Sequence, residues 1–140
     1  GTLGSLAVSG ASNIASVSEK LQVRGANESG TQQYDYGNNS VFYHPSVSGN
    51  ITVNLQNVPT SAGRALAVVM VVQQGATSRT IGVGSNQFGI NGTSYTVKWA
   101  NGVSPTPNSN QADVFSFTLV NTSTTATPSW VVYGTLGTFN

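Results

Sequence analysis

The sequence predicts an all-β fold: an antiparallel β-sandwich of the jelly-roll type, preceded by a short extended N-terminal β segment. Two observations lead to this fold class. About eight short segments alternate apolar and polar residues with the period of two that is typical of strands. Between them, clusters of Gly, Pro, Asn and Ser recur at intervals of roughly 8–12 residues, which is the spacing of turns in sandwiches, and no segment has a convincing helical pattern.

The first 39 residues are poor in apolar side chains. Two short runs, Leu6–Val8 and Leu21–Val23, have the period of a strand, and each is too small to form a core alone. Residues 27–39 are expected to form a loop, interrupted by the triplet Tyr34–Tyr36. We therefore expect an extended fibre-like or arm segment over residues 1–39 and a β-sandwich domain over residues 40–140.

Stronger strand patterns begin at residue 40. Residues 40–43 form a short aromatic run, and residues 50–55 alternate apolar with polar side chains like a half-buried strand. A turn at residues 57–60 follows, because Pro59 fixes φ and donates no ladder hydrogen bond. Residues 64–73 are apolar on both faces over their middle, which predicts a central strand that is covered on both sides.

The C-terminal half predicts two hairpins. Within residues 87–99, Asn91–Gly92 suits the two positive φ angles of a type I′ turn. The second strand of that hairpin is expected to alternate Tyr95, Val97 and Trp99. After a polar, proline-containing loop, residues 113–121 and 129–136 are expected to pair as a final hairpin.

The few charged residues limit the possible partners. Five Lys and Arg residues and four Asp and Glu residues give a net charge of +1, so the dense basic surface of a nucleic-acid-binding protein is missing. The longest apolar run, Ala65–Val72, is far shorter than the roughly 20 residues that span a bilayer. The chain has no Cys, which excludes a disulfide framework and a zinc–thiolate site. We expect neither nucleic-acid binding nor membrane insertion.

The sequence offers little for catalysis. Asp35 and Asp113 could form a glycosidase-like carboxylate pair, but a loop position for Asp35 and a strand-entry position for Asp113 are the simpler interpretation. His44 is the only imidazole and is interpreted as a surface or turn residue, and no nucleophile-elbow motif is present. We therefore expect no enzymatic activity, no catalytic residue, no metal site and no cofactor.

Aromatic side chains are the remaining candidates for recognition. Tyr34 and Tyr36 lie in the expected loop, where their rings could contact a sugar or a protein. Four other aromatic residues lie on alternating strands and are expected in the core or at a subunit interface: Trp99, Phe115, Phe117 and Trp130.

The order of segments in residues 50–136 resembles a known family. The chain reads NITVNLQNVPT, then VVQQGAT, then GINGTSYTVKWANGVSPTPNSNQADVFSFTLV, and closes with WVVYGTLG. This succession resembles a recurrent domain of bacteriophage virion proteins, common in tailed phages of aquatic bacteria and especially of cyanobacteria. Its most specific part is the Lys98–Trp99 pair, the Gly/Pro loop and the run Asp113–Phe117. The opening text GTLGSLAVSGASNI resembles the low-complexity β-repeats of trimeric phage fibres.

The resemblance implies a non-catalytic structural component at the surface of a phage virion. The expected role is a trimeric tail-fibre or head-fibre domain used in assembly and host attachment, and a capsid cement or decoration protein is the alternative within the same class. The expected partners are copies of the chain and other virion proteins, and a host cell-surface glycan is a further candidate. A carbohydrate-binding module that uses Tyr34, Asp35 and Tyr36 is the alternative from a different class.

Oligomerisation is also expected on physical grounds. The first 26 residues carry too little apolar surface to close a core of their own. Their burial must therefore come from other copies or from another surface.

Overall fold

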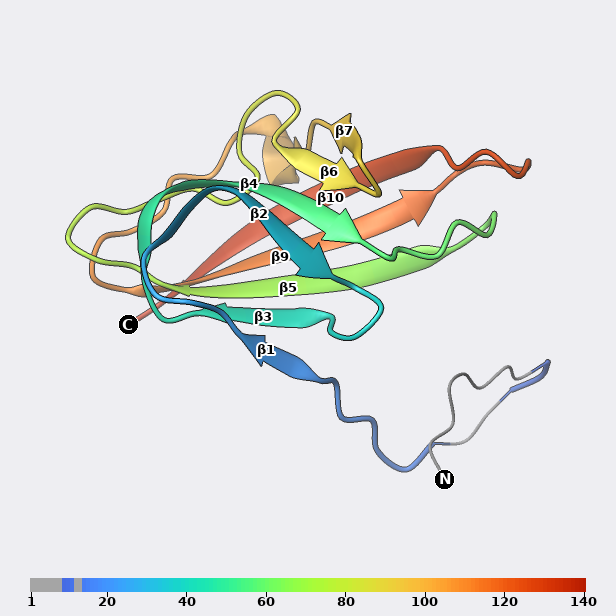
Figure 1. Cartoon of the computed structure of the whole chain (residues 1–140), viewed down its shortest axis with the longest axis horizontal. Coiled ribbons are helices and arrows are strands. Elements are labelled where there is room, and N and C mark those ends of the chain that lie inside the picture. Colours follow the sequence, from blue (N-terminus) through green and yellow to red (C-terminus); the bar gives the residue numbers. More distant parts are fainter. Residues whose placement is uncertain (1–8, 12–13) are drawn as a thin grey trace.

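The chain folds into two β-sheets that pack face to face (Figure 1). The computed structural model describes residues 9–11 and 14–140, so the strand expected at Leu6–Val8 lies outside the described residues. Strands dominate the described part, which contains no α-helix and no helix long and apolar enough to cross a membrane. The all-β sandwich predicted from the sequence is confirmed.

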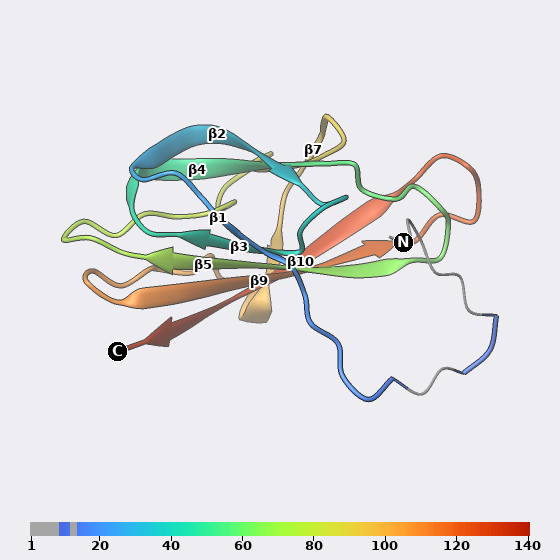
Figure 2. The same cartoon turned by 60° about the horizontal axis from the view of Figure 1, so that its bottom comes forward.

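The larger sheet has six strands and the smaller has four. The six-stranded sheet has the order β1 (Leu21–Val23), β3 (Val41–His44), β5 (Ala65–Gln73), β9 (Ala112–Asn121), β10 (Trp130–Phe139) and β8 (Lys98–Trp99). The four-stranded sheet has the order β2 (Glu28–Asp35), β4 (Val47–Gln56), β6 (Phe88–Ile90) and β7 (Thr93–Tyr95). A 3₁₀ turn, η1 (Ala100–Gly102), follows β8. Figure 2 shows the two layers, with β2 and β4 above β3, β5 and β9.

The first six strands alternate between the two sheets. As a result β1, β3 and β5 are parallel neighbours in one sheet, and β2, β4 and β6 are parallel neighbours in the other. Each connection crosses the sandwich instead of turning back beside its own strand, so the chain winds like a flat coil. The expectation of an antiparallel, jelly-roll-like sandwich is therefore wrong: both sheets are mixed.

The two hairpins predicted in the C-terminal half are confirmed. Ile90 pairs with Thr93 across Asn91 and Gly92, whose φ angles are 48° and 87°. Strands β9 and β10 pair antiparallel along their whole length. The strand predicted to continue from β7 through Trp99 is divided, however, because the chain crosses between the sheets at buried Val97 and enters the other sheet as β8.

Residues 28–35 correct the boundary expected near residue 40. They form β2, the edge strand of the smaller sheet, and pair with β4, while β1 pairs with β3. Only Tyr34 of β2 is fully buried, so the segment lacks the apolar alternation that identifies a strand in sequence. The sheets of the sandwich therefore begin at Leu21.

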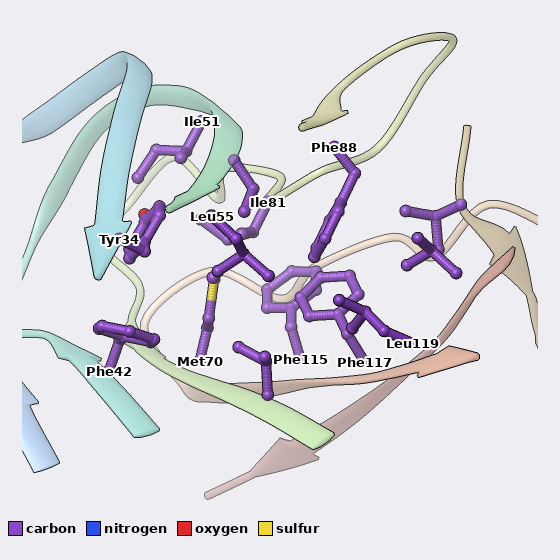
Figure 3. Packing of buried hydrophobic residues seen from close by; sticks show 14 of the residues in the cluster. Tyr34, Phe42, Ile51, Leu55, Met70, Ile81, Phe88, Phe115, Phe117 and Leu119 are labelled. Atoms are coloured by element: carbon purple, nitrogen blue, oxygen red, sulfur yellow. The ribbon is translucent and has the colours of Figure 1, made fainter. Parts of the chain in front are cut away.

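The core lies between the two sheets (Figure 3). Phe88 of the smaller sheet packs against Phe117 of the larger one, with ring centroids 4.7 Å apart. The fully buried side chains come from both layers and include Phe42, Leu55, Val68, Met70, Phe115 and Leu119. Burial of these side chains holds the two sheets together.

Strand β5 has the predicted central position but not the predicted coverage. It lies between β3 and β9, and its inward residues Val68, Met70 and Val72 are fully buried. Val69 and Val71 face the other way and are only half-buried, because no third layer of the described chain packs there. The expectation that β5 is covered on both sides is therefore wrong for the single chain.

Candidate functional site

The outer face of the six-stranded sheet, directed away from the smaller sheet, is mainly apolar and is the candidate functional site. We call it the outer face. The strand register aligns its side chains in rows across β1, β3, β5, β9 and β10. One row consists of Leu21, Val41, Val69, Ser116 and Thr135, and the next of Val23, Tyr43, Val71, Val114 and Gly137. Ala65, Ala67, Val120, Val131 and Tyr133 extend the face along β5, β9 and β10.

Several of these side chains are strongly exposed for apolar residues. Leu21 is 50% exposed, Val23 64% and Tyr133 48%, although each lies in a sheet strand. Phe139, at the end of β10, is 58% exposed. A β-branched or aromatic side chain in a strand normally packs against a covering layer, so the outer face has the character of a surface that another layer covers.

The outer face carries no charge over five of the six strands of its sheet. In β1, β3, β5, β9 and β10, all of which the structure describes, no outward-directed side chain is Lys, Arg, Asp or Glu. The charged side chain on this side of the sheet is Lys98, which lies on the edge strand β8 opposite Tyr133 of β10. Two copies of this face can therefore approach each other without like-charge repulsion.

The opposite surface of the sandwich is polar. The outward side chains of β4 are Ser48, Asn50, Thr52, Asn54 and Gln56, and β2 adds Thr31 and Gln33. The two sheets therefore differ sharply in what they present to their surroundings. A surface of hydroxyls and amides is adequately solvated by water, whereas the valine-rich surface is not.

The size of the outer face suits a protein interface. Five strands spaced by about 4.8 Å, with residues rising about 3.3 Å each, give a projected area on the order of 500–600 Å². This area includes the positions of Ser116, Thr118 and Thr135, and it compares with apolar patches of roughly 300–600 Å² on monomeric proteins. A standard interface buries about 800 Å² on each partner, which is of the same order.

The four aromatic residues expected in the core or at an interface lie on the inner side of the six-stranded sheet. Phe115 is 0% exposed, Phe117 1% and Trp130 5%. Trp99 is half-buried and contacts the edges of Phe115 and Phe117 at centroid distances of 6.4 and 5.8 Å. All four therefore contribute to the packing between the sheets.

Tyr34 is not a surface recognition residue. Its side chain is fully buried, with its ring 4.9 Å from that of Phe42 and its hydroxyl 3.1 Å from Nε2 of His44. The expectation of an exposed Tyr34 is wrong because β2 is a strand, which directs this residue inward. Tyr36 is half-buried and packs against the core, and its burial raises the pKa of its hydroxyl.

His44 is buried too, which corrects the surface or turn position expected for it. Its Nδ1 lies 3.0 Å from Glu28 Oε2, so Glu28, His44 and Tyr34 form a chain of carboxylate, imidazole and hydroxyl. Arg24 pairs with Glu28 at 3.0 Å, and its guanidinium lies 4.5 Å from the centroid of the Tyr34 ring. Burial raises the pKa of the Tyr34 hydroxyl, and no solvent reaches it. The series Glu28–His44–Tyr34 has the connectivity of a catalytic relay. Because His44 and Tyr34 are fully buried, these two side chains belong to the core.

The two aspartates have separate structural roles. Asp35 accepts hydrogen bonds from Asn38, from Asn57 and from the backbone N–H of Gly37, and the bonds from Asn57 and Asn38 lower the pKa of its carboxyl. Asp113 is buried and accepts from Gln74, Asn108 and Thr138. They stand in different sheets, and each carboxylate fixes its local chain. Among the described residues no group of three His, Asp or Glu side chains is placed to hold a metal ion.

Sequence reasoning did not identify the outer face. The sequence does contain a pattern that indicates an apolar outer face. Strand β5 has valines on both of its faces, and Val41 is next to Phe42 and Val114 next to Phe115, so apolar side chains point to both sides of these strands. Which of the two faces stays uncovered depends on how the sheets pair, and this is not encoded in any one strand. No known protein-family model matches the chain, and comparisons with curated proteins and with solved structures give no significant match.

Proposed function

We propose that this chain is a non-catalytic, homo-oligomeric structural module of a bacteriophage virion, in which the outer face packs against other copies of the chain. The observation that carries the proposal is the difference between the two surfaces of the sandwich. The smaller sheet presents Thr, Asn, Gln and Ser, whereas the outer face presents mainly Val, Leu, Ala and Tyr, with the hydroxyls of Ser116, Thr118 and Thr135 among them and no charge in β1, β3, β5, β9 and β10. Such an asymmetry supports permanent contact on one side and exposure to solvent on the other.

A second copy is the occupant that this surface favours. A charge-free surface is compatible with itself, since neither copy brings a charge that must be desolvated. The segment before β1 adds further exposed apolar side chains, with Ile14 58% and Val17 74% exposed. Oligomerisation would also protect the apolar strands from unspecific pairing.

We propose a trimer, as part of a tail fibre or head fibre used in assembly and host attachment. The support is the resemblance of residues 50–136 to phage virion domains and of the opening segment to trimeric fibre repeats. A capsid decoration protein would use the same oligomeric surface. Gold-labelled antibodies against the chain, viewed on phage particles by electron microscopy, separate the two roles, because they would mark either fibres or the capsid.

The oligomer is tested by sedimentation equilibrium at micromolar concentration. Val69→Lys places a charge in the middle of the outer face, and Thr31→Lys is the matched control on the polar surface. We expect the wild type and Thr31→Lys to sediment as trimers and Val69→Lys to sediment as a folded monomer. Ala67→Lys, at an exposed position of the same face, is the second variant if Val69→Lys does not fold. A folded wild-type monomer, or equal masses for the wild type and both outer-face variants, would contradict the proposal.

A further inference from the structure

A cavity of about 340 Å³ lies at the edge of the six-stranded sheet, where β8 ends beside β10. Its wall consists of Trp99, the loop that follows β8 and three residues of β10: Ala100, Asn101, Val103, Ser104, Pro105, Thr106, Gly134, Thr135 and Leu136. Neither its position nor its lining coincides with the tyrosines that the sequence suggested for recognition.

The cavity exists because two paired strands end at different points. Strand β8 pairs with β10 only at Tyr133 and Gly134 and then leaves the sheet, while β10 continues to Phe139. Asn101 and Gly102, with φ angles of 59° and 69°, turn the departing chain. The edge of β10 beyond Gly134 is therefore left beside the loop.

The polar side chains around the cavity are not used for folding. Asn101, Ser104, Thr106 and Thr135 make no side-chain hydrogen bond to any residue that the structure describes, and neither does the indole N–H of Trp99. Asn91 and Asn121 differ from Asn101 in this respect. The amide of Asn91 bonds to Val58, and the amide of Asn121 bonds to Thr60 and Ser61. The cavity thus gathers unused donors and acceptors at one place.

The lining selects the chemical class of the ligand. It contains no Lys, Arg, Asp, Glu or His, so it offers no charge partner to a phosphate, a carboxylate or an amine. It combines a tryptophan, whose indole has an apolar face and one donor, with amide and hydroxyl groups that both donate and accept. Neutral polyhydroxylated molecules match this set, because they present C–H faces and hydroxyl groups together.

We infer that this cavity binds a neutral saccharide unit, with Trp99 as its apolar wall and Asn101 and Thr106 as hydrogen-bonding groups. Its volume lies near the lower end of the roughly 300–1,000 Å³ found for small-molecule sites, which suits a short saccharide. The source of the saccharide rests on the proposed function: on a virion, the saccharide would belong to a host surface glycan.

The test is a titration followed by heteronuclear NMR of the intact chain. The probes are methyl glycosides of glucose, galactose, mannose and N-acetylglucosamine, with glucuronic acid as the charged comparison. We expect millimolar, saturable binding of at least one neutral glycoside that shifts the Trp99 indole and Asn101 resonances, and weaker binding of glucuronic acid.

Asn101→Gly is the main variant, because glycine keeps the left-handed backbone and removes only the amide. Asn110→Gly is the matched control, since Asn110 has φ 57° and lies outside the cavity. Loss of one hydrogen bond should weaken binding by roughly 3–10-fold in Asn101→Gly and in Thr106→Val, and not in Asn110→Gly.

Three results would overturn the inference: no saturable binding of any neutral glycoside, equal binding by Asn101→Gly, Thr106→Val and wild type, or binding of extended peptides along β10 in place of sugars. Sedimentation of the same samples reports assembly separately. A monomer that binds the glycoside would contradict the proposed oligomer alone, and a trimer that binds none would contradict the saccharide site alone.

Discussion

The imidazole Nε2 of His44 lies 3.1 Å from the hydroxyl of Tyr34, and both rings are fully buried between the two sheets. Burial lowers the pKa of His44 to about 4, an effect that the nearby carboxylate of Glu28 opposes and that Arg24 reinforces. The folded chain therefore holds a neutral imidazole at pH values where a free histidine, with a pKa of about 6.5, is already largely protonated.

The free energy of unfolding should consequently fall as the pH is lowered from about 6.5 to about 4. In that window the unfolded chain binds a proton at His44 and the folded chain does not, so acid favours unfolding. The loss should be on the order of 1–3 kcal/mol and can be measured by urea denaturation at a series of pH values.

His44→Gln supplies the control for this pH dependence, because His44 is the only histidine. The variant should be less stable than the wild type at neutral pH and nearly independent of pH between 6.5 and 4.5. Asp35 also makes stability depend on pH, but in a more acidic range. Because its pKa is lowered in the folded chain, its contribution to the free energy of unfolding is present above pH 3.8 and is lost as the pH falls further. An unchanged pH dependence in His44→Gln would contradict the assignment.

Tyr34→Phe should destabilise the fold by about 1–3 kcal/mol at neutral pH, because it leaves a buried ring nitrogen of His44 without its partner. Tyr36→Phe is the matched control, since its half-buried hydroxyl has no hydrogen-bond partner among the described residues. Chemical denaturation should give a clear loss for the first variant and a change within about 0.5 kcal/mol for the second. Equal losses would show that the Tyr34 hydroxyl contributes no specific bond.

Gly134→Ala should destabilise the chain by about 1–3 kcal/mol, because it forces atoms into an occupied space. A Cβ at Gly134 would lie 2.6 Å from Cζ3 of Trp99 and 2.7 Å from Cγ1 of Val97. Gly75→Ala is the control, since nothing lies within 4 Å of the corresponding Cβ. Thermal unfolding should show a lowered midpoint temperature for Gly134→Ala and an unchanged midpoint temperature for Gly75→Ala. Similar midpoints for the two variants would mean that Trp99 moves aside without cost.

The sequence determines the strands more clearly than their partners. Ile51, Val53 and Leu55 alternate with polar residues, and Asn91–Gly92 identifies its turn, so these elements could be predicted from local chemistry. After β3 the chain could turn back to a neighbouring strand of the same sheet or cross to the other sheet, and long-range packing decides between these paths. The chain crosses, so β3 and β5 are parallel, and the expectation of antiparallel pairing is wrong here. Strand β2 was missed because an edge strand with one buried residue, Tyr34, leaves almost no apolar pattern.

The candidate sites follow the same division. The sequence shows valines on both sides of β5, but the absence of a covering layer over Val69 becomes visible only when the described sheets are assembled. The cavity beside Trp99 depends on the different lengths of β8 and β10, which no local motif records. His44 follows an aromatic run and precedes Pro45, a setting that predicts a turn, yet β3 extends one residue further and directs its ring inward.

Asn91 should be worth more than its turn conformation alone. Its amide accepts from the backbone N–H of Val58 at 3.1 Å and donates to the carbonyl of the same residue at 2.8 Å, which joins the hairpin to the end of β4. Asn91→Gly keeps the positive φ and loses both bonds, at a cost of about 1–2 kcal/mol. Asn91→Ala loses the bonds and also strains the backbone, which should add about 1 kcal/mol. Urea denaturation of the two variants separates the contributions, and equal stabilities would show that the backbone conformation costs alanine nothing.

Added salt should not weaken the proposed oligomer. Salt screens contacts between charged groups over a distance of about 10 Å at 0.1 M and about 3 Å at 1 M, so an interface held by ion pairs dissociates as salt rises. The outer face has no charged side chain in its five described strands, and burial of its valines is insensitive to screening. Sedimentation equilibrium at low salt and at about 1 M NaCl should therefore give association constants that agree within about twofold or increase with salt. Sodium sulfate should strengthen association further, because excluded salts favour apolar burial. A tenfold weaker association at high salt would place the contact elsewhere, at charged residues such as Lys98, Arg64 or Glu19, and would exclude the outer face as the main interface.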